Sequence, residues 1–563
     1  MNTGTPALER EQPAETHTVF NQSRPLVDVN SYRGDTALRE AVVRHGAAWA
    51  GDALEAHGER CGSAEVIEWG FLANEYRPRF QGHDRQGFRV DAVRYHEAYH
   101  RLMALGLEAG LHSRPWTAPG PGAHVARAAQ YYLQAQVESG HGCPLTMTFA
   151  AVPTLRLTPA VADAWLPKVF ARAYDPRNVP HTEKSALTLG MGMTEKQGGS
   201  DVRANTTRAR ALAGGGPGGD YELVGHKWFT SAPMCDGFLM LAQSEGGLSC
   251  FLVPRWRPDG SKNPVQLQRL KDKLGNIANA SSELELRGAL GWLVGEEGRG
   301  VRAIIEMVAM TRFDCMIGSA AAQRQAVAQA VNHTLARSAF GRRLVDQPLM
   351  RNVLADLQLE VEGALALTLR MGEALDRSLA PAGHEHDKLL LRLGLPTGKY
   401  WICKRTPGLV YEAMECFGGN GVTEDFIFAR LYRDAPVNAI WEGSGNVQAL
   451  DMLRAVGRSP EVLDAWFAEL AATRGAHPLL DDAVDGLRAA LGDRGDLEYR
   501  ARALVDRLAL TLQGSLLLRG GSAAVADAFI RSRLAAGGDR NFGTLPRGVD
   551  VGALIERANP RAP

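Results

Sequence analysis

The chain has 563 residues, which is too long for a single hydrophobic core and predicts two to four domains. Lysine plus arginine equal aspartate plus glutamate at 63 each, so any basic patch that attracts nucleic acid must be local. Seven cysteines without a CxxC pair favour free thiols in a reducing cytoplasm over disulfides or structural zinc. We identify no signal peptide and no apolar run of about eighteen residues, and therefore expect no membrane association.

The N-terminal third of the chain is predicted to be mostly helical. Residues 1–34 are rich in turn-forming residues and are expected to form a poorly ordered arm. From 35 to 185, apolar residues such as Leu38, Val42 and Trp49 recur with a helical period. We therefore predict an α-helical domain over 35–185.

A metal-binding pattern occurs inside this region. His96, Glu97 and His100 match HExxH, in which two histidines one helical turn apart bind zinc and the glutamate activates water. A zinc protease needs a third ligand, and the residues that follow supply none. Because so short a pattern arises by chance in long helical proteins, we interpret both histidines as structural and expect no metal.

The hydrophobic period changes to two between residues 186 and 295. Short strands are predicted at 221–224, 238–241, 250–253 and 282–286, separated by turn-rich pieces. The glycine tract 214–219 lacks the Lys-Ser/Thr of a phosphate-binding loop, so we interpret it as a hairpin loop. A compact, mostly antiparallel β domain is the expected result.

Helical periodicity returns after residue 296 and continues to the C-terminus. Amphipathic runs at 311–338, 347–377 and 387–416 predict a helical bundle over 296–457, followed by an additional helical region over 458–563. The predicted fold class is therefore mainly α with a central β domain.

The stretch Trp441-Glu442-Gly443-Ser444-Gly445-Asn446 is the leading catalytic candidate. A carboxylate beside the Trp441 ring is partly desolvated, and desolvation raises its proton affinity towards the range useful for a general base. The glycines allow backbone amides to approach a ligand closely, and a helix begins directly afterwards. The alternative is a simple helix N-cap in which Ser444 or Asn446 caps and Glu442 is solvated.

Five motifs in fixed order resemble the acyl-CoA dehydrogenase flavoprotein superfamily over roughly residues 35–456. They lie at 191–202, 226–231, 337–347, 417–421 and 441–443. The segments 18–22, 193–202 and 310–314, together with the extra C-terminal helices, are similar to the AidB-like branch, which is tied to the adaptive response to DNA alkylation. The resemblance implies an N-terminal helical domain, an antiparallel β-barrel, a C-terminal four-helix bundle and a homotetramer.

The resemblance also implies an FAD site that is partly shared between protomers. Arg337, Phe340 and Gln347 would serve the FAD of a neighbouring protomer. The residues that it assigns to the cofactor are Met193, Thr194, Glu195, Gly198, Gly199, Ser200, Val202, Trp228, Thr230, Ser231, Arg337, Phe340, Gln347, Gly418, Gly419, Trp441, Gly443, Ser444, Gly445 and Asn446. The alternative is that the Gly, Ser and Thr residues merely form turns and caps.

The implied reaction is α,β-dehydrogenation of an acyl-CoA. Glu442 would remove the α-proton while a hydride leaves the β-carbon for flavin N5. Some members of the superfamily carry the base on an earlier helix, at the position held here by Thr311. Since threonine cannot act as that base, the role falls to Glu442, with Arg312 as a structural or electrostatic partner.

Proteins of the AidB type bind double-stranded DNA through the C-terminal helical region. Residues 457–563 contain fourteen arginines, fourteen acidic residues and no lysine, so nonspecific binding requires the arginines to gather on one face. The candidates are Arg454, Arg500, Arg502, Arg507, Arg531 and Arg533. A solvated helix face held by salt bridges is the alternative.

Four functions remain open at this point. The first is a DNA-associated flavoprotein that limits alkylation damage and has weak acyl-CoA dehydrogenase activity. The second is a metabolic acyl-CoA dehydrogenase without a DNA role, the third a non-catalytic flavoprotein that shields DNA, and the fourth a zinc peptidase. The segment 18–22 and the C-terminal extension favour the first over the second, whereas the sequence does not separate the first from the third.

Overall fold

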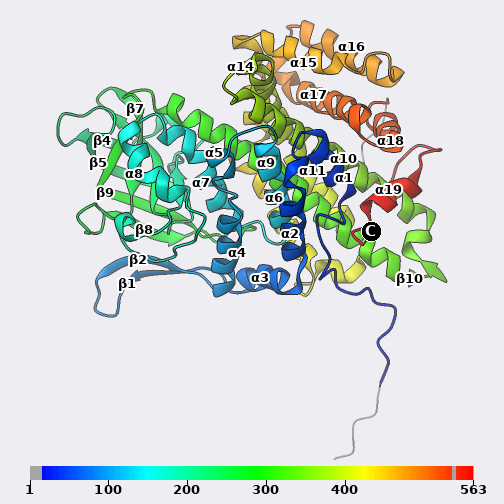
Figure 1. Ribbon diagram of the computed structural model, residues 1–563, viewed down its shortest axis with the longest axis horizontal. Helices are drawn as coiled ribbons and strands as arrows, with labels where there is room; N and C mark the ends of the chain where they lie inside the picture. Colours follow the sequence, from blue (N-terminus) through cyan, green and yellow to red (C-terminus); the bar gives the residue numbers. More distant parts are fainter. Residues whose placement is uncertain (1–15, 536–540, 562–563) are drawn as a thin grey trace, which may run out of the picture.

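The computed structural model describes residues 16–535 and 541–561. Figure 1 shows a β domain at one end, a helical body beside it and further helices along one edge. The N-terminal helices are α1 (Thr36–Arg44), α2 (Gly51–Gly62), α3 (Ala64–Glu75), α4 (Glu97–Glu108), α5 (Arg114–Thr117), α6 (Ala123–Ala135), α7 (Gly142–Leu155) and α8 (Pro159–Val169). Helices α6 and α7 are buried on almost every side, because they pack between the other N-terminal helices and the long helix α9.

One hairpin interrupts this helical part, where the sequence predicted helix. Strands β1 (Arg79–His83) and β2 (Arg89–Arg94) pair antiparallel, with Phe80 opposite Val93. These two side chains pack on Leu267 of the β domain. The helical prediction was wrong here because the apolar residues alternate along a strand that docks on a neighbouring sheet.

The central β domain is a closed barrel. Its strands are β3 (Leu189–Gly192), β4 (Arg208–Ala211), β5 (Asp220–Ser231), β6 (Gly237–Ser244), β7 (Gly247–Pro254), β8 (Val265–Leu270) and β9 (Ser281–Val294). The pairings β6–β4, β4–β5, β5–β9, β9–β7 and β7–β6 close a ring. Most pairs are antiparallel as predicted, although β3 and β4 each run parallel to β6. The tract 214–219 joins the antiparallel strands β4 and β5, which confirms the hairpin loop.

A bundle of long helices follows the barrel. It contains α9 (Gly300–Ala336), α10 (Pro348–Ser378), α11 (Glu385–Glu415) and α14 (Gly445–Arg458), with the short α12 (Ile427–Asp434) and α13 (Val437–Ile440) between the last two. Helices α9, α10 and α11 pack on one another, and α14 packs on α11. The structure confirms the predicted fold class, which is mainly α with a central β domain.

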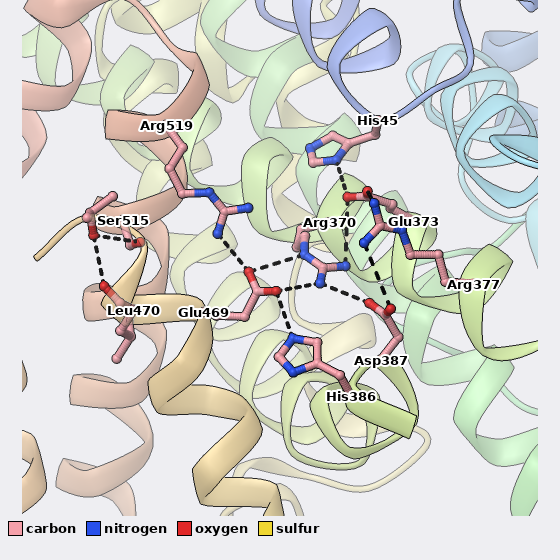
Figure 2. A network of polar contacts seen from close by, with 11 residues as sticks. His45, Arg370, Glu373, Arg377, His386, Asp387, Glu469, Leu470, Ser515 and Arg519 are labelled. Carbon is pink, nitrogen blue, oxygen red and sulfur yellow. Dashed lines mark hydrogen bonds and ion pairs between the residues drawn. The ribbon is translucent and has the colours of Figure 1, made fainter. Parts of the chain in front are cut away.

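The additional C-terminal helices are α15 (Glu461–Ala471), α16 (Pro478–Gly492), α17 (Leu497–Gly520), α18 (Ala523–Arg533) and α19 (Val551–Ala558). An ion network joins two of them, α15 and α17, to the bundle (Figure 2). Arg370 of α10 donates to Asp387 of α11 at 2.9 Å and to Glu469 of α15 at 2.5 Å. Glu469 also accepts from Arg519 of α17 at 2.7 Å. Since removing one partner would leave a buried charge unpaired, this network fixes how α15 and α17 sit on the bundle.

The described part of the N-terminal arm is docked on the body of the protein. Asn21 both accepts from the backbone N–H of Ser338 and donates to its carbonyl. Ser23 contacts His333, and Asp28 donates its N–H to the carbonyl of Gly62. The expectation of a poorly ordered arm is therefore wrong from residue 21 onwards, while residues 1–15 lie outside the described residues.

Candidate active site

Glu442 lies in a tight turn between α13 and α14. Its φ is +58° and that of Gly443 is +100°, so both residues occupy the left-handed region. The left-handed region costs a side-chain-bearing residue about 1–2 kcal/mol. Its neighbours must therefore hold the turn in place.

Two residues of the bundle helix α9 contact this turn. The hydroxyl of Thr311 donates to a carboxylate oxygen of Glu442 at 2.7 Å. Nε of Arg312 donates to the Glu442 carbonyl at 3.2 Å, and its Nη1 pairs with Asp451 at 2.6 Å. The residue at the superfamily's alternative base position thus supports Glu442 in this chain.

The electrostatics of Glu442 fit a general base. Burial is the largest influence and raises its pKa above the ordinary value, while the hydrogen bond from Thr311 and the charges of Lys399 and Arg312 act in the opposite direction. A carboxylate with raised proton affinity that is held by one hydroxyl can accept a proton from a weak carbon acid. The solvated N-cap alternative does not fit this environment.

The loop after β3 is held by a buried carboxylate. Glu195 is fully buried, and it pairs with Lys227 at 2.9 Å and accepts the N–H groups of Thr206 and Thr207. We expected Glu195 to line the flavin. That expectation needs correction, because the side chain turns inwards and serves to shape the loop.

The loop also contains a close contact that requires glycine. A Cβ added to Gly199 would lie 2.3 Å from the hydroxyl of Thr194. The carbonyl of Thr194 accepts the N–H of Trp228 at 2.8 Å, which ties the loop to strand β5. The loop residues Met193, Gly199 and Val202 are partly buried, whereas Gly198 and Ser200 are exposed.

Strand β5 presents polar groups beside this loop. Thr230 is fully buried, and its hydroxyl has no hydrogen-bond partner among the described residues. Trp228 is partly exposed, with the ammonium of Lys271 3.2 Å from its ring centroid. An unpartnered hydroxyl beside a half-exposed indole fits a flat heterocycle that offers hydrogen-bonding edges, so the residues present are compatible with a flavin.

Cys143 is a member of the site that the sequence did not indicate. Burial raises the pKa of its thiol to about 11, and the charges of Lys273 and Glu442 and the hydroxyl of Ser231 also act on it. It lies in the first turn of α7, and groups on the β domain and in the Glu442 turn both act on its thiol. No local sequence pattern could show this.

The remaining cofactor candidates divide into two groups. Trp441, Gly443, Ser444, Gly445 and Asn446 surround the base, and Ser444 precedes α14 without a capping side-chain hydrogen bond. Arg337, Phe340 and Gln347 surround the small hairpin of β10 (Ser338–Ala339) and β11 (Arg342–Arg343), at the other end of α9 (Figure 1).

Gly418 and Gly419 belong with this distant group. They follow α11, next to Phe417, whose ring stacks on His333. Within one protomer, therefore, neither the β10–β11 hairpin residues nor Gly418 and Gly419 lie beside Glu442.

The six candidate DNA contacts do not share one environment. Arg454, Arg502 and Arg507 are exposed, and Arg502 donates to Asn446 at 2.8 Å. Arg500 donates to backbone carbonyls near the start of α17, and Arg531 pairs with Asp527.

Arg533 was wrongly assigned to DNA. It is buried, and it pairs with Asp356 at 2.5 Å. Its guanidinium holds α18 against α10 and cannot reach a phosphate.

The HExxH segment has structural contacts. His96 caps α4 by accepting the N–H of Ala98, and its ring stacks on Tyr76. His100 is hydrogen-bonded to the hydroxyl of Tyr174 at 2.8 Å. Over residues 16–535 and 541–561, no group of three or more His, Cys, Asp or Glu side chains is placed to hold a metal ion.

Three family models match consecutive parts of the chain. The model of the N-terminal domain of the adaptive response protein AidB matches residues 21–176. The models of the middle and C-terminal domains of acyl-CoA dehydrogenase match residues 190–289 and 298–457. The fold and the matches define a flavin-dependent oxidoreductase of the acyl-CoA dehydrogenase family.

Similar proteins narrow this assignment. A relative from Escherichia coli (strain K12) that carries the name acyl-CoA dehydrogenase AidB is 46% identical, over 92% of this chain and 95% of that protein. Acyl-CoA dehydrogenase family member 11 of Caenorhabditis elegans is 32% identical, over 79% of this chain and 74% of that protein. The chain belongs to the AidB-like branch of the family.

A solved structure agrees with this assignment. Caenorhabditis elegans ACDH-11 in complex with C11-CoA superposes with a TM-score of 0.83 at 26% identity, covering 99% of this chain and 95% of that one. Among the described helices of the present chain, none has the length and apolar character needed to cross a membrane.

Proposed function

We propose that this protein removes the α-proton of a bound acyl-CoA with Glu442. The observation that carries the proposal is the partly buried Glu442 carboxylate, whose pKa is raised and whose oxygen accepts the Thr311 hydroxyl at 2.7 Å. The hydrogen bond orients the carboxylate for the proton transfer. The ACDH-11 structure, described with C11-CoA, supports a thioester of coenzyme A as the substrate class.

FAD is the cofactor proposed for this site. When bound, it supplies the hydride acceptor for the β-carbon. Trp228 would lie against its ring, and the unpartnered hydroxyl of Thr230 would meet one of its polar edges. Met193, Thr194, Gly199 and Val202 would hold it from the loop after β3, and the backbone of 443–446 would close the opposite side.

A homotetramer is proposed to complete the cofactor site. Phe340 is 98% exposed, and it lies in the hairpin after the C-terminal end of α9, whereas Glu442 contacts Thr311 near the start of that helix. A second protomer that places Arg337, Phe340 and Gln347 against the adenosine half of the FAD would bury this aromatic ring. The exposed Phe340 supports an arrangement in which each protomer serves the cofactor of another.

A role at double-stranded DNA is proposed from membership in the AidB-like branch. Arg454, Arg502 and Arg507 are exposed and carry charge that phosphates would neutralise. The protein would associate with duplexes and limit alkylation damage in a reducing cytoplasm. The seven cysteines, all of them buried free thiols, support a reducing compartment.

One preparation can test both parts of the proposal. The purified flavoprotein is titrated anaerobically with acyl-CoAs of different chain lengths while the flavin absorbance is recorded, and then with duplex DNA while the anisotropy of a labelled duplex is recorded. Bleaching by an acyl-CoA together with salt-dependent duplex binding is the expected result. Duplex binding without bleaching by any acyl-CoA would indicate a flavoprotein that only shields DNA. Bleaching without duplex binding would indicate a metabolic dehydrogenase.

A further inference from the structure

A buried lysine of α11 forms hydrogen bonds with the backbone of the Glu442 turn. Lys399 is 1% exposed, and its ammonium donates to the carbonyl of Trp441 at 2.7 Å and to that of Gly443 at 2.5 Å. It thus binds the residue before the base and the residue after it. A lysine has three donors, so two carbonyls fixed in this way define the direction in which the intervening side chain leaves the backbone.

The carbonyl of Glu442 itself is held by other side chains. Arg312 donates to it at 3.2 Å, and Gln448 donates to it at 2.9 Å and to the Gly443 carbonyl at 3.0 Å. Three consecutive carbonyls are therefore bonded to buried or partly buried side chains from α9, α11 and α14. Left-handed backbone at a site of this kind persists only where the surroundings over-determine it.

The two cations at the Glu442 turn, Lys399 and Arg312, differ in whether a carboxylate pairs with them. Arg312 is paired with Asp451, which also takes Arg392 at 2.9 Å. Among the described residues, the hydrogen bonds of Lys399 go to carbonyl oxygens, and no carboxylate lies within salt-bridge distance of its ammonium. The cysteine thiols Cys143 and Cys315 are the other titratable groups on which the Glu442 charge acts.

A buried ammonium held only by dipoles is costly unless an anion lies nearby. Glu442 is the carboxylate of the turn that Lys399 grips, and the charge of Lys399 acts to keep Glu442 ionised. The cation can therefore have two effects. It fixes the backbone of the turn, and it opposes the effect of burial on the proton affinity of the base.

We propose that Lys399 is the positioning residue of the base, aiming the Glu442 carboxylate without touching the substrate. This inference rests on the proposed role of Glu442. The aim comes from the two carbonyl contacts, and the control of proton affinity comes from the uncompensated charge. A neutral residue at position 399 leaves Glu442 protonated to a higher pH and its direction less fixed.

The test compares Lys399→Met, Lys399→Arg and Lys388→Met. Methionine keeps most of the side-chain volume without charge, and arginine restores the charge and the donors. Lys388 is the matched control because it lies on the same helix with its side chain 53% exposed, paired with Glu385. Two signals are recorded against pH: the carboxyl infrared band that Glu442→Gln removes, and the rate of flavin bleaching by acyl-CoA.

In Lys399→Met the proton affinity of Glu442 rises, because the charge of Lys399 acts to keep Glu442 ionised. Its infrared titration and the pH–rate profile move together to higher pH. Lys399→Arg restores most of both signals, and Lys388→Met changes neither.

An unchanged infrared titration in a folded Lys399→Met protein would overturn the proposal. So would a rate loss of the same size at every pH that arginine does not rescue, since that pattern indicates a purely structural lysine. Because the infrared band is read without substrate, the Lys399 proposal can fail while Glu442 remains the base. Conversely, if the Glu442→Gln variant bleaches at the normal rate, Glu442 is not the base. That result would hold even if the titration of Glu442 in the wild type depends on Lys399.

Discussion

The hydroxyl of Thr311 donates to the carboxylate of Glu442 at 2.7 Å, although 131 positions separate the two residues in the chain. Replacing Thr311 with valine keeps the shape of the side chain and removes this bond. Because the bond stabilises the ionised carboxylate, the pKa of Glu442 rises further in the variant. We expect the pH–rate profile of flavin bleaching by acyl-CoA to move to higher pH, so that the rate lost at low pH is recovered as the pH rises.

Serine at position 311 is the control for this prediction, since it retains the hydroxyl. A Thr311→Ser protein should keep the wild-type pH profile. An equal loss of rate in the valine and serine variants would show that the packing of the methyl group matters and the hydrogen bond does not.

The contact between Gly199 and Thr194 predicts a loss of cofactor affinity. A Cβ at 2.3 Å from the Thr194 hydroxyl forces the loop apart in Gly199→Ala. We expect the variant to fold with a normal melting temperature after FAD removal but to retain FAD at least tenfold more weakly, measured by equilibrium dialysis. The double variant Thr194→Ala/Gly199→Ala removes the hydroxyl and methyl groups of Thr194, two of the three close atoms, and should regain part of the affinity. Full FAD retention by the single variant would exclude this loop from the cofactor site.

Sequence patterns predicted most of the fold. The helical and strand periods predicted the order of helical domain, β domain and bundle, because burial of one face repeats locally along each element. The hairpin β1–β2 was missed, since its apolar face is defined only by docking on Leu267. Lys399 was missed for the same reason, because its contacts with the Glu442 turn come from a distant helix.

The assignment of charged residues shows the same limit. Arg507 and Arg533 are equivalent in sequence terms, as arginines of the same neutral region. One is exposed, and the other is buried against Asp356. No local pattern distinguishes them, because the partner carboxylate lies 177 positions earlier in the chain.

A buried carboxyl at the junction of the three main parts predicts a pH dependence of stability. Asp434 of α12 accepts the hydroxyl of Ser139 and the N–H of Asn276. Burial, followed by the charge of Glu138, raises its pKa to about 6. The folded protein therefore binds one proton more than the unfolded chain between the ordinary aspartate value of about 4 and pH 6.

The free energy of unfolding should accordingly fall as pH rises from about 4 to 6, by about 3 kcal/mol from this group, and should not change on its account above that range. In Asp434→Asn this decrease disappears. Asp425→Asn, at an exposed carboxylate on the preceding turn, should leave it intact. Urea unfolding at a series of pH values measures the effect, and identical slopes for wild type and Asp434→Asn would contradict it.

The exposed arginines predict a salt-dependent interaction with duplex DNA. Arg454 and Arg507 are exposed, and no hydrogen bond or ion pair of either guanidinium group is seen in the described residues. In Arg454→Glu/Arg507→Glu we expect the slope of log Kobs against log salt to become less negative by about 2, since each phosphate contact contributes about 0.9. Arg208→Glu, on the exposed strand β4 of the distant barrel, is the matched control and should bind as the wild type does. Equal binding by all three proteins would remove the C-terminal helices from the DNA site.

The most direct measurement follows the flavin of the wild type and of Glu442→Gln after rapid anaerobic mixing with an acyl-CoA that bleaches the wild type. Glutamine keeps the size and polarity of the side chain and cannot accept the α-proton, so FAD content and melting temperature should be unchanged. The account predicts that bleaching slows by about two to four powers of ten, the usual contribution of a positioned general base. Bleaching of the glutamine variant at the wild-type rate would contradict it.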